Sequence, residues 1–358
     1  MIYIGSENII TPLGESAQEN FKQMSLGNSS VQILPGGING EPLGISKFDN
    51  EESYLSRVLR CINGSLASSS FSNEDKFTLV ICSTKGEVSK LKNEEELYSL
   101  DELAQDIVKA MPSIENSFTV SNACVSGISG VILASDLIQL NKANHVIVVG
   151  ADMVTNFTLA GFQSFFAISN EVCKPYDKNR KGINLGEGCA SFILSNSKNI
   201  YNDACAEVIG GANRNDANHI SGPSRTGEGL YRSIKASLSL ASVDAKDIDF
   251  ICSHGTATAY NDEMESQAFN RLNLTNTPLH SLKGFIGHTL GASGVIEISI
   301  CLQMLKHQKV IPSYGFEENG LTHELNIQEK TEDKTLNLIL KSGSGFGGLN
   351  SSILLKKL

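Results

Sequence analysis

The stretch VSNACVSG, residues 120–127, places a cysteine between a strand-like segment and a helix-like segment. Cys124 is surrounded by small side chains, which leave room for a ligand, and Gly127 follows it closely. A cysteine at a helix N-terminus meets unpaired backbone N–H groups and the positive end of the helix dipole, and both favour the thiolate. The stretch therefore leaves three interpretations of Cys124 open: buried core residue, metal ligand or nucleophile.

Short strand-like runs alternate with longer helix-like runs along the rest of the chain. The runs rich in β-branched residues are FTLVIC (77–82), HVIVVGAD (145–152), CASFILS (189–195), IDFICS (248–253) and NLILKSG (337–343). The helical patterns cover residues 92–111, 125–140, 227–241 and 293–307. Strands that are apolar throughout favour a layered α/β fold whose sheets are covered on both faces.

The composition indicates a large globular protein. The chain has 358 residues, of which 41% are hydrophobic and 19% charged, and its formal net charge is −10. An acidic chain is a poor general binder of nucleic acid, which requires a basic face. No stretch has the length and apolarity of a membrane span, and no basic, apolar leader opens the sequence.

The eight cysteines form no CxxC pair and no zinc-like cluster with histidine, which argues against a metal centre. Reduced thiols of this kind are typical of a cytoplasmic protein. Five of the cysteines are predicted to be ordinary core residues: Cys61, Cys82, Cys189, Cys205 and Cys301.

A second motif, SHGTATAYNDEMES (253–266), begins where a buried strand ends. Its His254 lies at the carboxyl end of that strand, which is where α/β proteins place ligands. Asp262 and Glu265 fall in what is predicted to be the first turn of a helix, where acidic side chains are stabilised. An ordinary helix start with a chance histidine is the alternative.

A third motif, LKGFIGHTLGASGVIE (282–297), holds His288 among glycines after another strand-like run. Lys283 precedes the histidine and Glu297 follows it. The glycines suit a tight loop with close backbone approach. The pattern is neither GxGxxG nor GxxxxGK[ST], which argues against a nucleotide site.

A fourth motif, SGSGFGGLNSSILL (342–355), surrounds Phe346 with glycines ahead of a final buried strand. Backbone N–H groups in such a loop can point at a developing anion. A plain hairpin turn is the alternative that the glycine content alone favours.

Taken in order, these motifs resemble the β-ketoacyl-acyl-carrier-protein synthases, condensing enzymes of the thiolase superfamily. IYIGSENIITPLGES (2–16) is similar to the opening strand of that family, and CKPYDKNRKGINLGEGCASFIL (173–194) is similar to its segment with Pro, Asp, Arg and Gly-Glu-Gly. Elongating synthases carry Cys-His-His, initiating synthases carry Asn at the second histidine position, and thiolases have a second cysteine near the C-terminus. His288, with no cysteine after Cys301, therefore indicates the elongating branch.

The resemblance implies an α/β, thiolase-like duplicated fold with five layers, α-β-α-β-α. Residues 1–205 would form the half that carries the nucleophile. Residues 206–358 would form the half that carries both histidines and the glycine-rich loop. VICSTKG (80–86) and FICSHGT (250–256) echo each other, as a duplication would produce.

The resemblance also implies an acyltransferase that performs a decarboxylative Claisen condensation of a cysteine-bound acyl group with malonyl-acyl carrier protein, in fatty acid, polyketide or pigment synthesis. Phosphopantetheine would arrive on the carrier protein, so neither a cofactor nor a metal is expected. The implied roles are nucleophile for Cys124, enolate stabilisation for His254 and His288, oxyanion hole and gating for Cys124 and Phe346, and support for Lys283 and Glu297.

The expected partners are acyl carrier protein and a second copy of the chain, with a paralogue as the alternative second subunit. KPYDKNRK (174–181) is a candidate docking patch for the carrier, and TLAGFQSFFAIS (158–169) is a candidate dimer segment. The chain departs from the family by a short region before Cys124, and by Lys181 and Ser344 where an acid and an aromatic are common. Two other functions stay open: a non-catalytic chain-length partner subunit, and a thiolase-like enzyme acting on coenzyme A thioesters.

Overall fold

The computed structural model describes residues 1–37, 40–72, 74–88 and 99–358. Within these residues, the main sheet has ten strands in the order β11-β10-β14-β15-β9-β1-β8-β6-β4-β5. The strands of this sheet are β1 Tyr3–Ile10, β4 Phe77–Cys82, β5 Ile114–Val120, β6 His145–Asp152, β8 Gly188–Ser195, β9 Ala206–Asn215, β10 Phe250–Cys252, β11 Leu279–His280, β14 Leu338–Gly345 and β15 Leu349–Lys357. Two small sheets are separate from the main sheet. One contains β2 Gln32–Leu34, β3 Leu43–Ser46 and β7 Leu185–Gly186, and the other contains β12 Lys309–Val310 and β13 Glu332–Asp333.

The main sheet consists of two sets of five strands with the same order and directions. In the first set β4 lies between β5 and β6 and is parallel to both, and β8 and β1 continue the sheet in antiparallel pairing. In the second set β10 takes the place of β4, between β11 and β14, and β15 and β9 follow in antiparallel pairing. The sets join where Tyr3 and Ile4 of β1 pair with β9. Because the pairing of β1 with β9 makes one continuous sheet, the sheet itself does not divide the chain into two domains. The predicted division into residues 1–205 and 206–358 stays a prediction.

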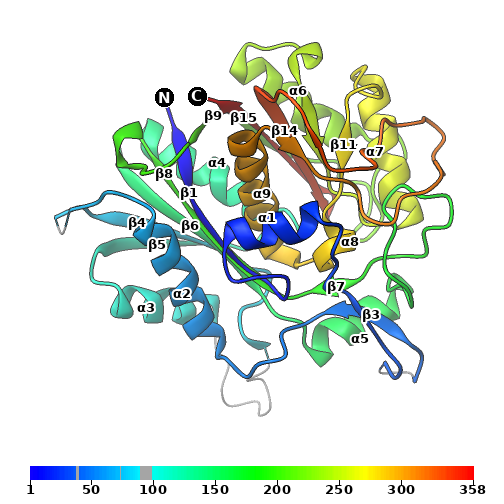
Figure 1. The fold of residues 1–358 in the computed structure, drawn as a ribbon, viewed down its shortest axis with the longest axis horizontal. Helices are drawn as coiled ribbons and strands as arrows, with labels where there is room; N and C mark the ends of the chain where they lie inside the picture. Colours follow the sequence, from blue (N-terminus) through cyan, green and yellow to red (C-terminus); the bar gives the residue numbers. More distant parts are fainter. Residues whose placement is uncertain (38–39, 73, 89–98) are drawn as a thin grey trace.

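Helices cover the sheet in layers (Figure 1). The helices are α1 Ala17–Ser25, α2 Tyr54–Ala67, α3 Leu100–Ala110, α4 Ser126–Gln139, α5 Asn156–Ser164, α6 Glu228–Ala241, α7 Ala259–Arg271, α8 Lys283–Ile286 and α9 Ser293–His307. Helices α4 and α9 contact each other and strands of both sets, so they form the middle layer. Helices α2 and α3 cover the outer face of the first set, and α6 with α7 covers that of the second. The five-layer α-β-α-β-α arrangement is therefore confirmed.

The middle layer explains why helix α9 is buried on all sides. Every residue of α9 from Ser293 to Leu305 is buried, as expected for a helix with a sheet on each side. The largest core cluster joins this helix to α4 and to both strand sets through residues such as Ile128, Val295 and Ile339. This packing brings the N-terminal ends of the two helices close together.

The helical patterns at 125–140, 227–241 and 293–307 match α4, α6 and α9 to within one residue at each end. Of the predicted helix 92–111, residues 92–98 lie outside the described residues, and α3 covers Leu100–Ala110. Sequence patterns missed β9, in which Gly210 and Gly211 weaken the strand signal. No helix in the described part of the chain is both long and apolar enough to cross a bilayer.

Candidate active site

Cys124 lies in a tight turn between β5 and α4. Ala123 adopts a left-handed backbone conformation with φ of 46°, which is costly for a residue with a side chain. The Ser126 hydroxyl holds this turn, because it donates to the Ala123 carbonyl at 2.6 Å and accepts from the Asn122 N–H at 2.8 Å. The turn brings Cys124 to the wall of a cavity of about 470 Å³.

His254 follows β10 directly, and two buried carboxylates of α7 hold its loop. Glu265 accepts the backbone N–H groups of His254 at 2.8 Å and Gly255 at 2.7 Å. Asp262 accepts the N–H of Thr256 at 3.0 Å. The two acids therefore fix the backbone beside the histidine. Asp262 lies in the first turn of α7 as the sequence predicted, but the same prediction for Glu265 was wrong, because Glu265 lies in the second turn.

His288 enters the same cavity from the loop after α8. The prediction that it follows a strand was wrong, because α8 separates it from β11. Gly287 has φ of 67°, and a side chain there would meet the Leu185 carbonyl oxygen at 2.6 Å. The His288 N–H donates to the Asn184 carbonyl at 2.7 Å, so the histidine backbone is anchored to the segment before β7.

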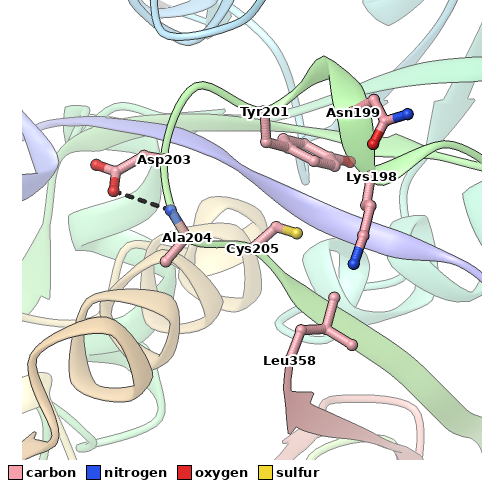
Figure 2. A pocket seen from close by; sticks show the side chains of 7 residues that line it. All are labelled: Lys198, Asn199, Tyr201, Asp203, Ala204, Cys205 and Leu358. Atoms are coloured by element: carbon pink, nitrogen blue, oxygen red, sulfur yellow. Dashed lines mark hydrogen bonds between the residues drawn. The ribbon is translucent and has the colours of Figure 1, made fainter.

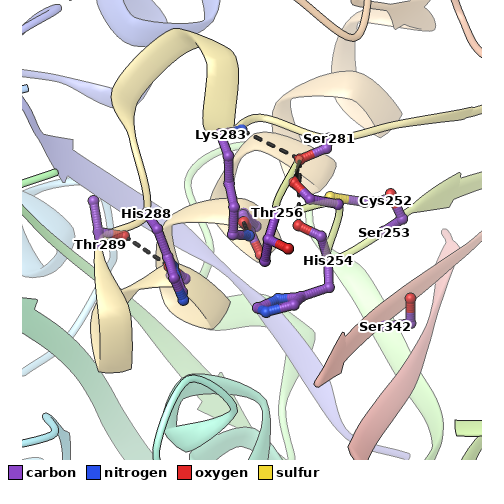
Figure 3. A network of polar contacts seen from close by, with 12 residues as sticks. Cys252, Ser253, His254, Thr256, Ser281, Lys283, His288, Thr289 and Ser342 are labelled. Carbon is purple, nitrogen blue, oxygen red and sulfur yellow. Dashed lines mark hydrogen bonds and ion pairs between the residues drawn. The ribbon is translucent and has the colours of Figure 1, made fainter. Parts of the chain in front are cut away.

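The three side chains converge in the cavity. The Cys124 sulfur and a ring nitrogen from each of His254 and His288 all lie within 4.8 Å of one another. The two imidazole rings stand nearly perpendicular with centroids 5.2 Å apart, and Figure 3 shows them directed into one space. The His288 Nε2 atom is buried and has no hydrogen-bond partner within the part of the chain that the structure describes. The arrangement thus offers a thiol and at least one unused imidazole nitrogen to a ligand.

A buried charge cluster lies beside the histidines. Glu297 bonds to Lys283 through one carboxylate oxygen at 2.8 Å and to Lys341 through the other at 2.8 Å. The pair of Lys283 and Glu297 expected from the sequence is present, but two ammonium groups share the single carboxylate. The cluster therefore carries a net positive charge.

The positive charge and burial keep both imidazoles neutral. Burial and then Lys283 lower the pKa of His254 and of His288 well below its usual value, and Lys341 adds to this effect. Each neutral ring has one N–H and one acceptor nitrogen. A thiolate and two histidines are also the donor types of zinc sites, but the net positive cluster opposes a divalent cation here.

The expectation that the helix terminus makes Cys124 favour the thiolate was wrong. Burial raises the pKa of this thiol to about 11, and Lys283 and the backbone N–H of Phe346 offset only part of that effect. Desolvation disfavours the charged form more strongly than the helix terminus favours it. The resting thiol is therefore protonated at neutral pH.

The glycine-rich loop is a hairpin turn between the antiparallel strands β14 and β15, the alternative that the sequence offered, and it lies against Cys124. A side chain at Gly345 would sit 3.1 Å from the Cys124 nitrogen, so only glycine allows this approach without a shift. The Phe346 ring lines the cavity and stacks on Phe162 with ring centroids 5.7 Å apart. Phe165 packs edge-on against the same ring at 5.6 Å.

The predicted docking patch at 174–181 is not a free basic surface. Lys174 and Lys178 bond to two glutamates of one loop, at 3.5 and 2.9 Å, and Lys181 bonds to Glu171 at 3.4 Å. A lysine and a glutamate this close together have little net charge when seen from farther than a Debye length, so these lysines attract a distant acidic partner only weakly. This segment therefore presents less free positive charge than its sequence indicates, and its role in docking stays a prediction.

Four of the five cysteines assigned to the core are buried, and Cys205 is not. Cys205 lines a separate surface hollow with Lys198, Tyr201 and the C-terminal Leu358 (Figure 2). This hollow shares no lining residue with the cavity at Cys124.

Sequence reasoning missed Lys341 and the holding role of Glu265. A signal for Lys341 existed, since a lysine inside the apolar run NLILKSG is almost never buried without a partner. The carboxylates had no such signal, because acidic residues at a helix start are common in any fold.

Two family models match consecutive parts of the chain. The N-terminal domain model of β-ketoacyl synthases matches residues 116–199, and the C-terminal domain model matches residues 205–317. Together they cover more than half of the chain and contain Cys124, His254 and His288.

Curated relatives and solved structures agree with these models. The 3-oxoacyl-[acyl-carrier-protein] synthase 2 of Rhizobium meliloti is 31% identical over 67% of this chain and 61% of its own length. The tetracenomycin polyketide synthase ketoacyl synthase alpha subunit of Streptomyces glaucescens is 32% identical over 66% of this chain and 59% of its own length. The match thus spans about three fifths of these relatives. A solved β-ketoacyl synthase from Burkholderia phymatum superimposes with a TM-score of 0.89 at 21% identity, covering 100% of this chain and 99% of that one.

Proposed function

The chain belongs to the β-ketoacyl synthase family, and we propose that it joins an acyl group on Cys124 to malonyl-acyl carrier protein with loss of carbon dioxide. The observation that carries the proposal is the convergence of the Cys124 sulfur with nitrogens of two neutral, buried histidines within 4.8 Å. A thiol suits acyl transfer, and neutral imidazoles can donate to an enolate.

The first half-reaction loads the enzyme. The Cys124 sulfur attacks the thioester carbonyl of an acyl-carrier protein and gives up its proton, and the carrier thiol leaves with a proton in exchange. The thiol is protonated at rest, so its proton must leave as the carbon–sulfur bond forms and pass to the departing carrier thiolate. Backbone N–H groups of Cys124 and Phe346 would hold the tetrahedral oxyanion, each contributing roughly 3 kcal/mol.

The second half-reaction makes the carbon–carbon bond. Breakage of the malonyl carbon–carboxylate bond releases carbon dioxide and leaves an enolate, whose oxygen would accept N–H bonds from His254 and His288. The enolate carbon then attacks the acyl carbonyl, and the sulfur of Cys124 leaves as a thiolate, which takes a proton from solvent to restore the resting thiol. The net positive charge of the cluster formed by Lys283, Lys341 and Glu297 favours an anion at this place.

We further propose acyl carrier protein as the partner that delivers both groups, and a dimer as the assembly. The segment 158–169 supports a dimer, because Phe165 and Phe166 expose 54% and 95% of their surface there. A paralogous second subunit is the alternative assembly. The two other activities predict different results: a thiolase-like enzyme forms product from acetyl-coenzyme A without any carrier, and a non-catalytic subunit never acylates Cys124.

Two variants separate the half-reactions. Cys124→Ala should lose the acyl-enzyme, yet retain some decarboxylation of malonyl-carrier protein, because both histidines remain. His288→Ala should still load an acyl group on Cys124 while decarboxylation falls by on the order of a hundredfold. Intact-protein mass spectrometry reports loading, and carbon dioxide release reports decarboxylation.

Either of two results would contradict the proposal. Condensation by Cys124→Ala would place the nucleophile elsewhere. Normal decarboxylation by His288→Ala would remove the two-histidine enolate site. The mass of the adduct on the wild-type enzyme, after incubation with mixed acyl-carrier proteins, identifies the acyl group at the same time.

A further inference from the structure

Two buried hydroxyl groups form a chain that ends on His288. The His288 Nδ1 atom lies 2.8 Å from the Ser293 hydroxyl, which in turn lies 3.1 Å from the Thr289 hydroxyl. All three side chains are at most 2% exposed. The other ring nitrogen, Nε2, is buried and has no hydrogen-bond partner among the described residues. The tautomer of His288 therefore depends on which way the protons of this chain point.

The two directions leave different groups without a hydrogen-bond partner. If Nδ1 carried the imidazole proton and donated to Ser293, the Ser293 hydroxyl would donate to Thr289. The Thr289 proton would then be buried without an acceptor, since Ser293 is the one hydrogen-bond partner of that hydroxyl in the described structure. A buried unsatisfied donor costs about 1–3 kcal/mol.

The opposite direction satisfies both hydroxyls and leaves one group unsatisfied among the described residues, the Nε2–H of His288, which faces the cavity. The first direction leaves two, the Thr289 proton and the Nε2 lone pair. Thr289 donates to Ser293, and Ser293 donates to Nδ1 of His288, so the proton of the neutral ring resides on Nε2. We infer that Ser293, backed by Thr289, is a positioning residue that sets the Nε2–H tautomer of His288 and so aims a donor into the cavity. Hydrogen positions follow from the network in this way, because the heavy atoms alone do not show them.

The Ser293 hydroxyl has no competing structural task. It is the first residue of α9, but the N-cap is Ala292, and no side chain caps this helix. Ser299, on the same helix, shows the ordinary use of a buried helical serine, since its hydroxyl donates to the Val295 carbonyl at 2.9 Å. Ser293 makes no such bond in the described structure, so its hydroxyl is free to donate to the imidazole Nδ1.

The effect of this tautomer on catalysis rests on the proposed function, whereas the tautomer itself does not. A donor at Nε2 is what a developing enolate requires, whereas the other tautomer would present a lone pair and repel it. Loss of the relay should therefore reduce malonyl decarboxylation and leave acyl loading of Cys124 nearly unchanged. The tautomer itself can be observed without any substrate.

The test uses the full-length protein labelled with ¹⁵N-histidine. Long-range ¹H–¹⁵N correlation spectra report which ring nitrogen of His288 is protonated, and His288→Asn identifies its signals. We expect Nε2–H in the wild type and in Ser299→Ala, the matched control. Ser293→Ala should populate Nδ1–H and slow decarboxylation by about tenfold, Thr289→Val should slow it by about threefold, and Ser293→Thr should restore the wild-type tautomer.

Retention of pure Nε2–H in both Ser293→Ala and Thr289→Val would overturn the inference, as would Nδ1–H in the wild type. If Ser293→Ala fails to fold, Thr289→Val still removes the terminal donor and decides the question. If the wild-type protein shows the Nε2–H tautomer but decarboxylates no malonyl-carrier protein, the proposed function is refuted. The inference that Ser293 and Thr289 set the tautomer of His288 would still hold.

Discussion

The contact between the two central helices offers a sharp test of how the fold positions the site. Gly127 of α4 and Gly294 of α9 face each other where the helices cross. A Cβ atom at Gly127 would lie 2.5 Å from the Val295 nitrogen and 2.8 Å from the Gly294 Cα, whereas ordinary contact begins at 3.4 Å. All of these are backbone atoms, so no side chain can move aside. Gly127→Ala should therefore force the helices apart by about 0.9 Å.

Both stability and activity should respond. Overpacking of a buried contact costs about 1–3 kcal/mol, and the better helix propensity of alanine returns at most about 1 kcal/mol. Cys124 lies in the turn just before α4 and His288 precedes α9, so the same shift widens the distance between thiol and imidazole. A displacement near 1 Å at reacting groups can reduce the rate by about a hundredfold. We expect a lower midpoint of guanidinium unfolding and a condensation rate reduced between about ten- and a hundredfold.

Gly161→Ala provides the matched control, because Gly161 lies in helix α5 and an added Cβ there meets no atom within 4 Å. Its unfolding midpoint should stay level or rise, as helix propensity alone predicts. Wild-type stability together with condensation within twofold of wild type in Gly127→Ala would refute the argument that this glycine contact sets the site geometry.

Three further predictions follow from the charges at the site. Glu265→Gln replaces one of two acceptors for the His254 loop with a donor, so unfolding should cost about 1–3 kcal/mol less and condensation should slow; equal stability in denaturant titrations would contradict this. Alkylation of Cys124 by iodoacetamide should accelerate about tenfold per pH unit below about 11, since the pKa is raised and only the thiolate reacts, and a plateau near pH 8 on peptide mapping would contradict the raised pKa. Lys341→Met should leave Glu297 paired with one lysine and raise the imidazole pKa values toward their usual range; unchanged histidine titration by NMR would show that Lys341 does not act on them.

The sequence by itself determined the local elements and the identities of the reactive groups. Helices such as α6 were predictable because an apolar pattern with the helical period depends only on neighbours along the chain. Cys124, His254 and His288 were also recognisable, because each stands at the end of a strand or beside glycines that local backbone geometry requires. Elements with a weak local signal, such as the glycine-containing β9, were missed for the same reason.

Only the tertiary structure decided the distances and the charges. The two strand sets and the crossing of α4 and α9 bring Cys124 to His288, and no local pattern contains that contact. The thiol pKa, the sharing of Glu297 by two lysines, and the hydroxyl chain on His288 likewise depend on burial and on partners distant in sequence or set by loop geometry. The sequence specifies which chemical groups are present, whereas their pKa values depend on the burial and the neighbouring charges that tertiary packing creates.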